Sequence, residues 1–321
     1  MRAVVIEDYG TPGVFTEQTL PAPSITGTQV LIEMYAATVS SADQLVRSGA
    51  FKNGMRLQFP HVLGIEAAGV VRATGQNVSQ LQVGDRVMGL SRSGGCYADF
   101  IALEEQAAVV LPPELSFQEA AALPASALTA WQALFQYGRL LSGQRILIHA
   151  GAGGVGHLAV QMAKQYGAYV IATARANNHE FVRQLGADEV IDYTTTDFAE
   201  AAGTVDIVLD MVRDTAVDAD TGIGATERKN LQILRDNGRL ISLVDPQIAT
   251  HPVVRGIEAR FAYIEPNAKD LASIIRQVHE HKLRAHIEEI FPFTVQGISA
   301  AHLLYESRKV RGKLVIVRQQ E

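Results

Sequence analysis

The stretch QRILIHAGAGGVGHLAVQMAKQYGAYVIATAR, residues 144–175, decides the fold of this chain. It opens with the short apolar run Ile146–Ile148, which has the length and the β-branched residues expected of a buried parallel strand. A glycine-rich segment follows at residues 151–156, and after it apolar residues recur at helical spacing. A second apolar run, Tyr169–Ala172, is typical of another strand. The order strand, glycine-rich turn, helix and strand predicts the first βαβ unit of a dinucleotide-binding fold.

Each glycine of the segment has a physical role in such a turn. Gly151 permits the tight turn after the strand, and Gly153 lets the backbone approach a pyrophosphate because it has no Cβ. Gly156 allows the helix to pack closely against the strand. Gly154 and Val155 complete the turn, whose free N–H groups would meet the pyrophosphate at the positive end of the helix. An ordinary turn is the alternative, but the flanking strand and helix favour nucleotide binding.

The composition of the chain indicates a globular protein of two domains. Its 321 residues exceed what one core usually holds, and 47% hydrophobic against 19% charged residues is ordinary for a well-packed protein. The net charge of −6 argues against a nucleic-acid or anionic-membrane partner. Cys96 is the only cysteine, which excludes a disulfide framework and a cysteine-rich zinc lobe. Neither a signal peptide nor a bilayer-spanning stretch is visible, so we expect a soluble, cytoplasmic protein.

Turn residues and short apolar runs predict a β-rich first region. Near its end, Ser116 and Glu119 have the spacing of a helix-capping box, and a longer helix is expected at Ala127–Tyr137. Strands and helices then alternate as far as a helix at Lys269–His279, after which short strands return. We therefore predict a Rossmann domain at residues 119–282, inserted in a β-rich domain formed by residues 1–118 and 283–321.

Three predictions concern the second half of the α/β region. A helix is expected at Leu231–Arg235 and is ended by Gly238. The last strand of the sheet is expected at Arg260–Ile264. Residues 213–230 show no clear periodicity and are interpreted as a solvated loop.

Several motifs, in this order, resemble those of the medium-chain dehydrogenases/reductases, in the zinc-independent quinone reductase and alkenal reductase branch. The most distinctive are Gly64-x-Glu66-x-x-Gly69 and Gly153-Gly154-Val155-Gly156, and the others are Ser40–Asp43, Leu63–Val71, Val83–Val87, Leu128–Ala130 and Leu185–Asp188. The resemblance covers nearly the whole chain. It implies a doubly wound Rossmann sheet inserted in a β-rich GroES-like catalytic domain. It also implies a homodimer, in which the edge strand Arg260–Ile264 would pair with its copy across a two-fold axis.

The resemblance argues against a catalytic metal in this chain. The zinc-dependent alcohol dehydrogenases of the same superfamily hold Zn²⁺ with two cysteines and one histidine, and the matching positions here are Ser40, Ile65 and Ala125. Isoleucine and alanine have no ligand atom, and a serine hydroxyl is a poor ligand for Zn²⁺. The quinone reductase branch often has asparagine at the position of Ser40 and tyrosine at that of Leu45, so its substrate preference does not carry over.

The segment after the second strand favours NADPH over NADH. NAD-dependent enzymes place an acidic side chain there to bind the ribose hydroxyls, whereas residues 173–178 contain none. Arg175 could pair with a 2′-phosphate, and the resemblance places Tyr193 near the same group. The alternative is that Arg175 is an exposed loop residue and the selectivity is weak. The cofactor-binding candidates outside the glycine turn are Arg175, Asn178, Tyr193, Ser242 and Val244.

Reduction without a metal favours an activated acceptor. Hydride transfer to a conjugated carbonyl or a quinone spreads the charge onto an oxygen atom, which a few hydrogen-bond donors can stabilise. The family resemblance places Ser40 and Thr129 beside the nicotinamide, with Thr129 orienting the ring and Ser40 binding the substrate or the cofactor ribose. Asp43 is either a direct part of this site or a carboxylate that caps the start of a helix.

Two functions fit these observations. The first is an NADPH-dependent reductase whose partner is a small electrophilic carbonyl or quinone substrate. The second is an NADPH-binding protein of the same fold with little turnover and a structural or regulatory role. Ser40 and Thr129 favour the enzyme, whereas the glycine turn fits both functions.

Overall fold

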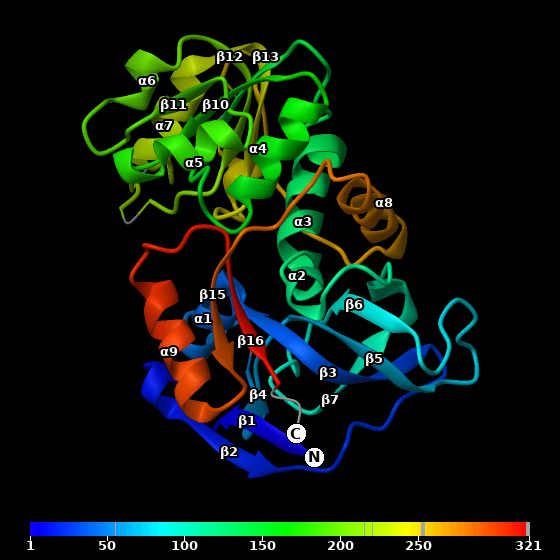
Figure 1. The fold of residues 1–321 in the computed structure, drawn as a ribbon. Coiled ribbons are helices and arrows are strands. Elements are labelled where there is room, and N and C mark those ends of the chain that lie inside the picture. Colours follow the sequence, from blue (N-terminus) through cyan, green and yellow to red (C-terminus); the bar gives the residue numbers. More distant parts are fainter. Residues whose placement is uncertain (55, 215, 220, 252–253, 319–321) are drawn as a thin grey trace. The chain divides into compact units, whose positions relative to one another are not determined.

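The βαβ unit predicted from residues 144–175 lies at the centre of a parallel sheet (Figure 1). The computed structural model, which describes residues 1–54, 56–214, 216–219, 221–251 and 254–318, places strand β9 at Arg145–Ile148, helix α4 at Gly156–Gln165 and strand β10 at Tyr169–Thr173. Strands β9 and β10 pair in parallel, and Leu158 and Met162 of α4 are buried. The predicted order strand, turn, helix and strand is therefore confirmed.

Six parallel strands form this sheet, in the order β11-β10-β9-β12-β13-β14. The chain starts in the middle of the sheet and moves first to one edge and then to the other, which is the doubly wound order of a dinucleotide-binding fold. Leu147, Ile171, Val208 and Leu240 of four neighbouring strands share one apolar core. The further elements are β11 (Glu189–Ile191), β12 (Val205–Asp210), β13 (Leu234–Ser242), β14 (Glu258–Phe261), α5 (His179–Gln184), α6 (Phe198–Ala201) and α7 (Ala225–Ile233).

A mostly antiparallel sheet forms the centre of the β-rich region, in the order β15-β16-β3-β5-β6-β8, and β7 also pairs with β3. A smaller sheet has the order β2-β1-β4. Val30, Ile32 and Met34 of β3 are buried, because alternate side chains of a strand point to the same face. The elements are β1 (Arg2–Ile6), β2 (Phe15–Thr19), β3 (Gln29–Val39), β4 (His61–Val62), β5 (Glu66–Thr74), β6 (Arg86–Leu90), β7 (Phe100–Glu104), β8 (Ala108–Val110), β15 (Ile287–Pro292), β16 (Lys313–Val317), α1 (Ser41–Arg47), α2 (Phe117–Ala121), α8 (Ala268–His279) and α9 (Val295–Glu306).

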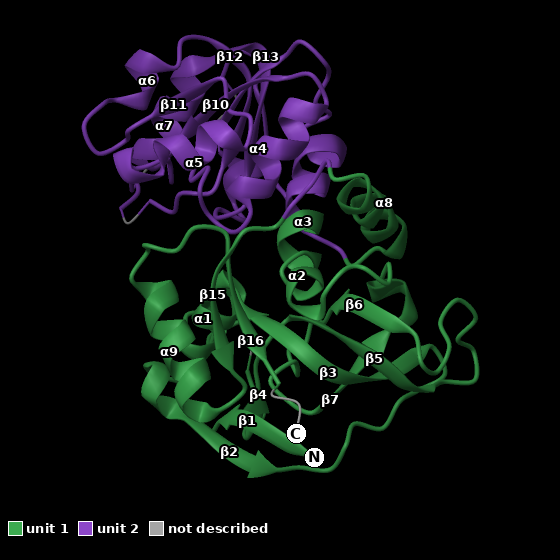
Figure 2. Ribbon diagram, in the orientation of Figure 1, with its two compact units in different colours: residues 1–128, 266–281, 285–321 green, residues 129–265, 282–284 purple. Residues whose placement is uncertain are grey.

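The chain divides into two units, which Figure 2 shows in green and purple. Unit 1 comprises Met1–Leu128, Pro266–His281 and Ala285–Glu321, and unit 2 comprises Thr129–Glu265 and Lys282–Arg284. The sequence-based division gave residues 119–128 and 266–281 to the second domain, and its boundaries stay a prediction. Among the described residues, no helix has the length and apolar composition needed to cross a bilayer.

The helices around the unit boundary agree with the predicted pattern. The Ser116 hydroxyl accepts a 3.2 Å hydrogen bond from the Glu119 N–H, and the Glu119 carboxylate accepts one of 3.3 Å from the Ser116 N–H, so the capping box is confirmed. Helix α3 (Pro124–Trp131) continues into a π-helical turn at Gln132–Tyr137, which accounts for the long helix predicted at Ala127–Tyr137.

The helix predicted at Leu231–Arg235 is confirmed only for Leu231–Ile233, which form the end of α7, and the predicted helix end at Gly238 is wrong. Helix α7 gives way directly to β13, which begins at Leu234. The register of β13 against β12 shifts between Leu234 and Arg239, and Asn237 has a φ of 57° in this irregular segment. Gly238 therefore belongs to an irregularity within a strand, where a glycine is as typical as at the end of a helix.

Residues 213–230 contain the start of a helix that the sequence does not reveal. Helix α7 begins at Ala225, inside the stretch interpreted as a loop, of which residues 215 and 220 lie outside the described residues. Its N-cap residue, Gly224, has no side chain. The carboxylate of Asp214 replaces it and accepts hydrogen bonds from the N–H of Thr226 at 3.0 Å and from its hydroxyl at 2.8 Å. The capping residue is distant in sequence, so the local pattern could not predict this helix start.

The buried carboxylate of Glu66 joins four elements of unit 1. Glu66 stands on β5, and its Oε1 contacts the hydroxyl of Thr38 on β3 and the ammonium group of Lys313 on β16. Its Oε2 accepts a 2.7 Å hydrogen bond from the N–H of Ala125 at the start of α3. A buried charge is stable only when it is paired, so the C-terminal strand supplies the cation that this carboxylate requires.

Replacing Lys313 with methionine should destabilise the protein by about 3–5 kcal/mol, because Glu66 would keep its buried charge without a cation. The free energy of unfolding from urea titrations measures the loss. Lys309→Met is the control, because Lys309 is exposed and its replacement should change stability by less than about 0.5 kcal/mol. Equal stability of the two variants would contradict this role of the ion pair.

Candidate functional site

The glycine turn connects the carboxyl end of β9 to the first residue of α4. In this turn the residue with a positive φ is Ala150, at 48°, whereas Gly151, which was predicted to permit the tight turn, does not have one. Gly151 is needed for packing instead, because a Cβ there would lie 2.9 Å from the Cβ of Ala172. The N–H of Gly151 donates to the carbonyl oxygen of Thr173 at 2.9 Å, which fixes the turn to the neighbouring strand β10.

The second half of the turn presents backbone N–H groups at the start of a helix. Gly156 begins α4, and a Cβ there would lie only 2.2 Å from the carbonyl oxygen of Ala150. Gly153 is in a more open position, where a Cβ would be 3.2 Å from the same oxygen. Within the described residues, the N–H groups of Gly154 and Val155 contact no backbone acceptor. A helix N-terminus with free N–H groups suits a phosphate anion, so the turn fits a dinucleotide pyrophosphate.

The structure brings Arg175 and Tyr193 together. The Nε of Arg175 donates a 3.0 Å hydrogen bond to the phenol oxygen of Tyr193, and both side chains are exposed. The two residues follow the neighbouring parallel strands β10 and β11, so their meeting results from the sheet order. Asn178 ends the short helical turn Ala176–Asn178 after Arg175 and precedes α5.

Ser242 and Val244 form a turn at the carboxyl end of β13. The Ser242 hydroxyl oxygen accepts a 3.2 Å hydrogen bond from the N–H of Val244 and lies 3.3 Å from Asp210 Oδ2, its partner position on β12. Burial, together with the neighbouring carboxylates of Asp214 and Glu227, raises the pKa of Asp210 to about 7. The binding of a nicotinamide carboxamide by the backbone of this turn stays a prediction.

In unit 1, Ser40 and Asp43 form the capping box that begins α1. The Ser40 hydroxyl donates a 2.6 Å hydrogen bond to Asp43 Oδ2, and Oδ1 accepts one of 2.9 Å from the N–H of Gly64. Burial raises the pKa of Asp43 to about 6, although these hydrogen bonds favour the charged form. The observed contacts of Asp43 are those of a helix-capping carboxylate, and its direct catalytic role stays a prediction.

The positions that correspond to zinc ligands do not fit a metal ion. Ile65 and Ala125 offer only backbone atoms, and the backbone N–H of Ala125 donates to Glu66. The hydroxyl of Ser40 donates to Asp43. These three residues therefore do not provide the ligands of a catalytic metal ion, and we assign no step of the reaction to one. The remaining catalytic candidate, Thr129, lies half-buried on α3 as the first residue of unit 2.

Three buried polar residues beneath the glycine turn were not predicted. His149 follows β9, Thr173 ends β10, and Asn230 lies on α7. The imidazole of His149 contacts the Thr173 hydroxyl at 3.2 Å and Asn230 Oδ1 at 2.8 Å. Burial lowers the pKa of His149 to about 4, so the ring is neutral at physiological pH. His149 and Thr173 could have been found from the sequence, because each lies at the carboxyl end of a predicted strand. Nothing in the sequence indicates that Asn230 is their neighbour.

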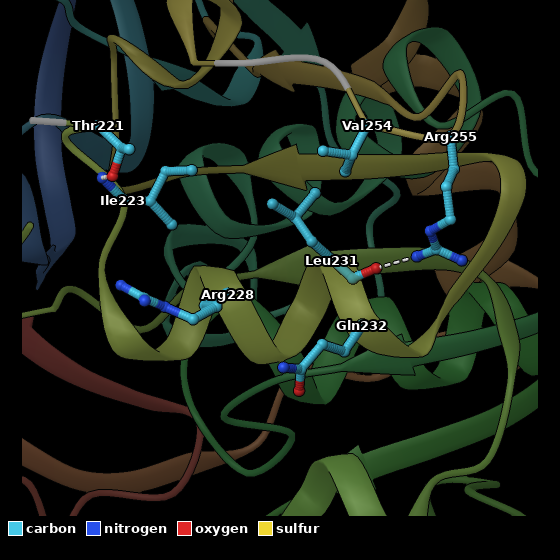
Figure 3. Close-up of a pocket in the computed structure, with 7 residues that line it drawn as sticks. All are labelled: Thr221, Ile223, Arg228, Leu231, Gln232, Val254 and Arg255. Carbon is cyan, nitrogen blue, oxygen red and sulfur yellow. Dashed lines mark hydrogen bonds between the residues drawn. The ribbon is translucent and has the colours of Figure 1, made fainter.

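A shallow groove of about 500 Å³ lies elsewhere on unit 2 (Figure 3). Ile223, Leu231 and Val254 give it an apolar floor, and Arg228 and Arg255 lie at its sides. The guanidinium group of Arg255 donates to the carbonyl oxygen of Leu231, as the dashed line in Figure 3 marks. The residues that line the groove belong neither to the glycine turn nor to the Arg175–Tyr193 pair.

Glu227, Asp245 and His251 offer ligand atoms that lie within 4.8 Å of one another. The Nδ1 of His251 is 2.8 Å from Glu227, and its Nε2 is 3.6 Å from Asp245. Both ring nitrogens thus face carboxylates, and the histidine links α7 to the loop after β13. The pattern of histidines in the sequence does not indicate this cluster, because Glu227 comes from α7, whereas Asp245 and His251 come from the loop after β13.

Two family models match the chain. "Alcohol dehydrogenase GroES-like domain" matches residues 26–131, and "Zinc-binding dehydrogenase" matches residues 185–316. With the antiparallel sheet and the six-stranded parallel sheet, these matches confirm the predicted GroES-like and Rossmann architecture. The second name mentions zinc, whereas the residues at the ligand positions here are Ser40, Ile65 and Ala125.

Relatives and solved structures agree on one branch of a superfamily. The chain is 39% identical over 209 residues to the chloroplastic quinone-oxidoreductase homolog of Spinacia oleracea, over 62% of this chain and 63% of the relative. It therefore spans less than two thirds of that relative's length. It is 31% identical over 327 residues to the chloroplastic NADPH-dependent alkenal/one oxidoreductase of Arabidopsis thaliana, over 98% of this chain and 79% of the relative. The quinone oxidoreductase from Coxiella burnetii is 33% identical with a TM-score of 0.88, over 99% of each chain.

The raised pKa of Asp210 predicts a pH dependence of stability. The ordinary pKa of 3.8 in the unfolded chain rises to about 7 in the fold, so this group stabilises the protein fully below pH 4 and loses its effect as the pH rises through about 7. Asp210→Asn should remove that dependence, which amounts to at most about 1.4 kcal/mol per pH unit. Urea titrations at several pH values give the difference between wild type and variant.

Asp188→Asn is the control for this experiment. Burial raises the pKa of Asp188, but the ion pair with Lys164 and the hydrogen bonds of Asp188 lower it below the ordinary value of 3.8. The contribution of Asp188 to stability is therefore lost only as the pH falls below 3.8. A difference curve for Asp210→Asn that is flat between pH 4 and 7 would contradict the prediction.

Proposed function

The chain belongs to the medium-chain dehydrogenase/reductase superfamily, in the branch of the quinone oxidoreductases and alkenal/one reductases, and on this premise we propose that it is an NADPH-dependent, zinc-independent reductase of quinones or α,β-unsaturated carbonyls. The glycine turn at residues 151–156 supports dinucleotide binding. When bound, the dihydronicotinamide supplies a hydride.

The choice of NADPH over NADH rests on the contact between Arg175 and Tyr193. The guanidinium group of Arg175 lies just after β10, is exposed and donates a hydrogen bond to Tyr193. The ribose of a bound dinucleotide is expected at this end of β10. Residues 173–178 contain no carboxylate that would bind the ribose hydroxyls or repel a 2′-phosphate. A guanidinium group binds phosphate oxygens through a planar pair of hydrogen bonds. The names of the relatives include an NADPH-dependent oxidoreductase, which supports the same choice.

The residues at the positions of the zinc ligands, Ser40, Ile65 and Ala125, do not suit a metal ion, and this favours a substrate with an activated carbonyl group. Without a Lewis acid, reduction of a saturated ketone lacks a strong stabiliser for the developing charge. A quinone or an enone spreads this charge through conjugation, so a few hydrogen-bond donors suffice. The printed names of the similar proteins refer to quinones and to alkenals or enones, in agreement with this class of substrate.

Ser40, Thr129 and Asp43 have distinct roles in this proposal. The Ser40 hydroxyl donates to the Asp43 carboxylate and accepts from the Asp43 N–H, so one lone pair of its oxygen is left to accept a hydrogen bond from a cofactor ribose hydroxyl. Thr129 orients the nicotinamide ring with its hydroxyl. Asp43 holds Ser40 in place, and the final proton comes from water or from a cofactor hydroxyl.

We also propose that the protein is a homodimer. Strand β14 is the last strand of its sheet, so one of its edges can pair with a second copy. A monomer mass in solution would contradict this. The cytoplasmic location stays a prediction, since the similar plant proteins are chloroplastic.

The reductase is tested by following the oxidation of NADPH with a quinone, a long-chain enal and a saturated aldehyde, with and without a chelator. We expect chelator-resistant turnover of the quinone or the enal and none of the saturated aldehyde. Tight binding of NADPH without turnover of any acceptor would instead favour the binding protein with a structural or regulatory role.

Arg175→Ala should weaken NADPH binding about tenfold or more and leave NADH binding nearly unchanged, because it removes a charged hydrogen bond to the 2′-phosphate. Titrations of nicotinamide fluorescence give both affinities. Arg183→Ala is the matched control, since Arg183 is an exposed arginine on the nearby helix α5. An equal loss of NADPH and NADH affinity in Arg175→Ala would contradict a role in 2′-phosphate recognition.

A further inference from the structure

We propose that Thr173, oriented by His149 and Asn230, is the positioning residue that holds the pyrophosphate-binding turn in its binding conformation. The inference rests on the proposed use of a dinucleotide cofactor. It assigns a role to three buried side chains that the glycine motif and the Arg175–Tyr193 pair leave unexplained.

The hydrogen bonds of the three residues have a defined direction. The Oδ1 of Asn230 can only accept, so the Nε2 of His149, 2.8 Å away, carries the hydrogen. The ring is neutral, and its Nδ1 is therefore an acceptor. It follows that the hydroxyl of Thr173, at 3.2 Å, donates to this Nδ1. The lone pairs of the Thr173 oxygen then face away from the imidazole, toward the turn.

Thr173 uses its oxygen to hold the one strained residue of the turn. The backbone N–H of Ala150 donates to Thr173 Oγ1 at 3.1 Å, and Ala150 has a φ of 48°. A residue with a Cβ rarely adopts this left-handed conformation, so it needs support from its surroundings. The next N–H, that of Gly151, donates to the carbonyl oxygen of Thr173, so one residue of β10 holds two successive N–H groups of the turn.

The orientation of Ala150 sets the positions of the later glycines. Its carbonyl oxygen accepts a 2.9 Å hydrogen bond from the N–H of Gly153 and packs against the α-carbon of Gly156. If Ala150 relaxed to a negative φ, this carbonyl group would turn away from Gly153. The N–H groups of Gly154 and Val155, which suit the pyrophosphate, would then lose their arrangement.

The surroundings keep the Thr173 hydroxyl in one orientation. His149 and Thr173 are each 2% exposed and Asn230 is fully buried, so water does not compete for these hydrogen bonds. The ring of Phe198 packs edge-on against the imidazole, with 4.7 Å between the ring centroids. Among the described residues, the Nδ2 of Asn230 has no acceptor, and its Oδ1 contacts His149. Helix α7, which carries Asn230, is thereby connected to the cofactor turn.

The test compares Thr173→Val, which removes the hydroxyl, with Thr173→Ser, which keeps it. Calorimetric titrations measure the affinity of each variant for NADPH and for adenosine 2′-monophosphate, which lacks a pyrophosphate. We expect Thr173→Val to bind NADPH about tenfold more weakly and the monophosphate within about twofold of wild type. Thr173→Ser should bind both ligands like the wild type. Asn230→Ala should weaken NADPH binding in the same selective way.

Three results would overturn the inference. The first is unchanged NADPH affinity in Thr173→Val or in Asn230→Ala, and the second is an equal loss for both ligands, which indicates a general loosening of unit 2. The third is a hydrogen on Nδ1 instead of Nε2 of His149, which the nitrogen chemical shifts of its ring reveal. Selective loss in Thr173→Val, in a protein that reduces no acceptor, would support the inference while contradicting the proposed reductase. A wild-type protein that binds no dinucleotide would contradict both.

Discussion

The buried carboxylate of Glu66 is the interaction on which unit 1 depends. It is the meeting point of β3, β5, β16 and the start of α3, and each of these elements supplies one partner or the carboxylate itself. Removing a carboxylate from water is costly unless every partner is in place. The segments of unit 1 are far apart in the sequence, and this shared charge favours the arrangement in which all of its partners meet. In unit 2 the corresponding constraint is the conformation of Ala150, which the side chain of a neighbouring strand maintains.

The fold was predictable where its causes are local. The apolar runs and the glycine turn of residues 144–175 are local patterns, and they correctly predict the βαβ unit. The start of α7 was not predictable, because its capping group is Asp214 and not the adjacent Gly224. Gly238 was misinterpreted for a similar reason, since a glycine suits a helix end and a strand irregularity equally well. The deciding factor there is the pairing of β13 with β12, which a single segment does not encode.

In the candidate site, too, the contacts between distant elements were harder to predict from the sequence than the local patterns. Arg175 was chosen from the sequence as a partner for a 2′-phosphate, and the family resemblance placed Tyr193 near the same group. Their contact results from the pairing of β10 with β11, which are neighbours in a doubly wound sheet. Asn230 could not be connected with the glycine turn, since α7 reaches His149 only through tertiary packing. Asp43 was given two alternative roles from the sequence. Its carboxylate caps a helix and accepts a hydrogen bond from the hydroxyl of Ser40, whereas its direct role in the site stays a prediction.

The order of the strands along the chain has a consequence for protein synthesis. All six strands of unit 2 lie within residues 145–261, so this sheet is complete in sequence before β16 is made. The sheet of unit 1 includes β16, and the ammonium group that neutralises Glu66 comes 247 residues later in the chain. On the ribosome, β3 and β5 must therefore wait for β16, with an unpaired charge on Glu66 and an open sheet edge. The sheet of unit 2 can be completed before the sheet of unit 1, although β3 and β5 precede it in the chain.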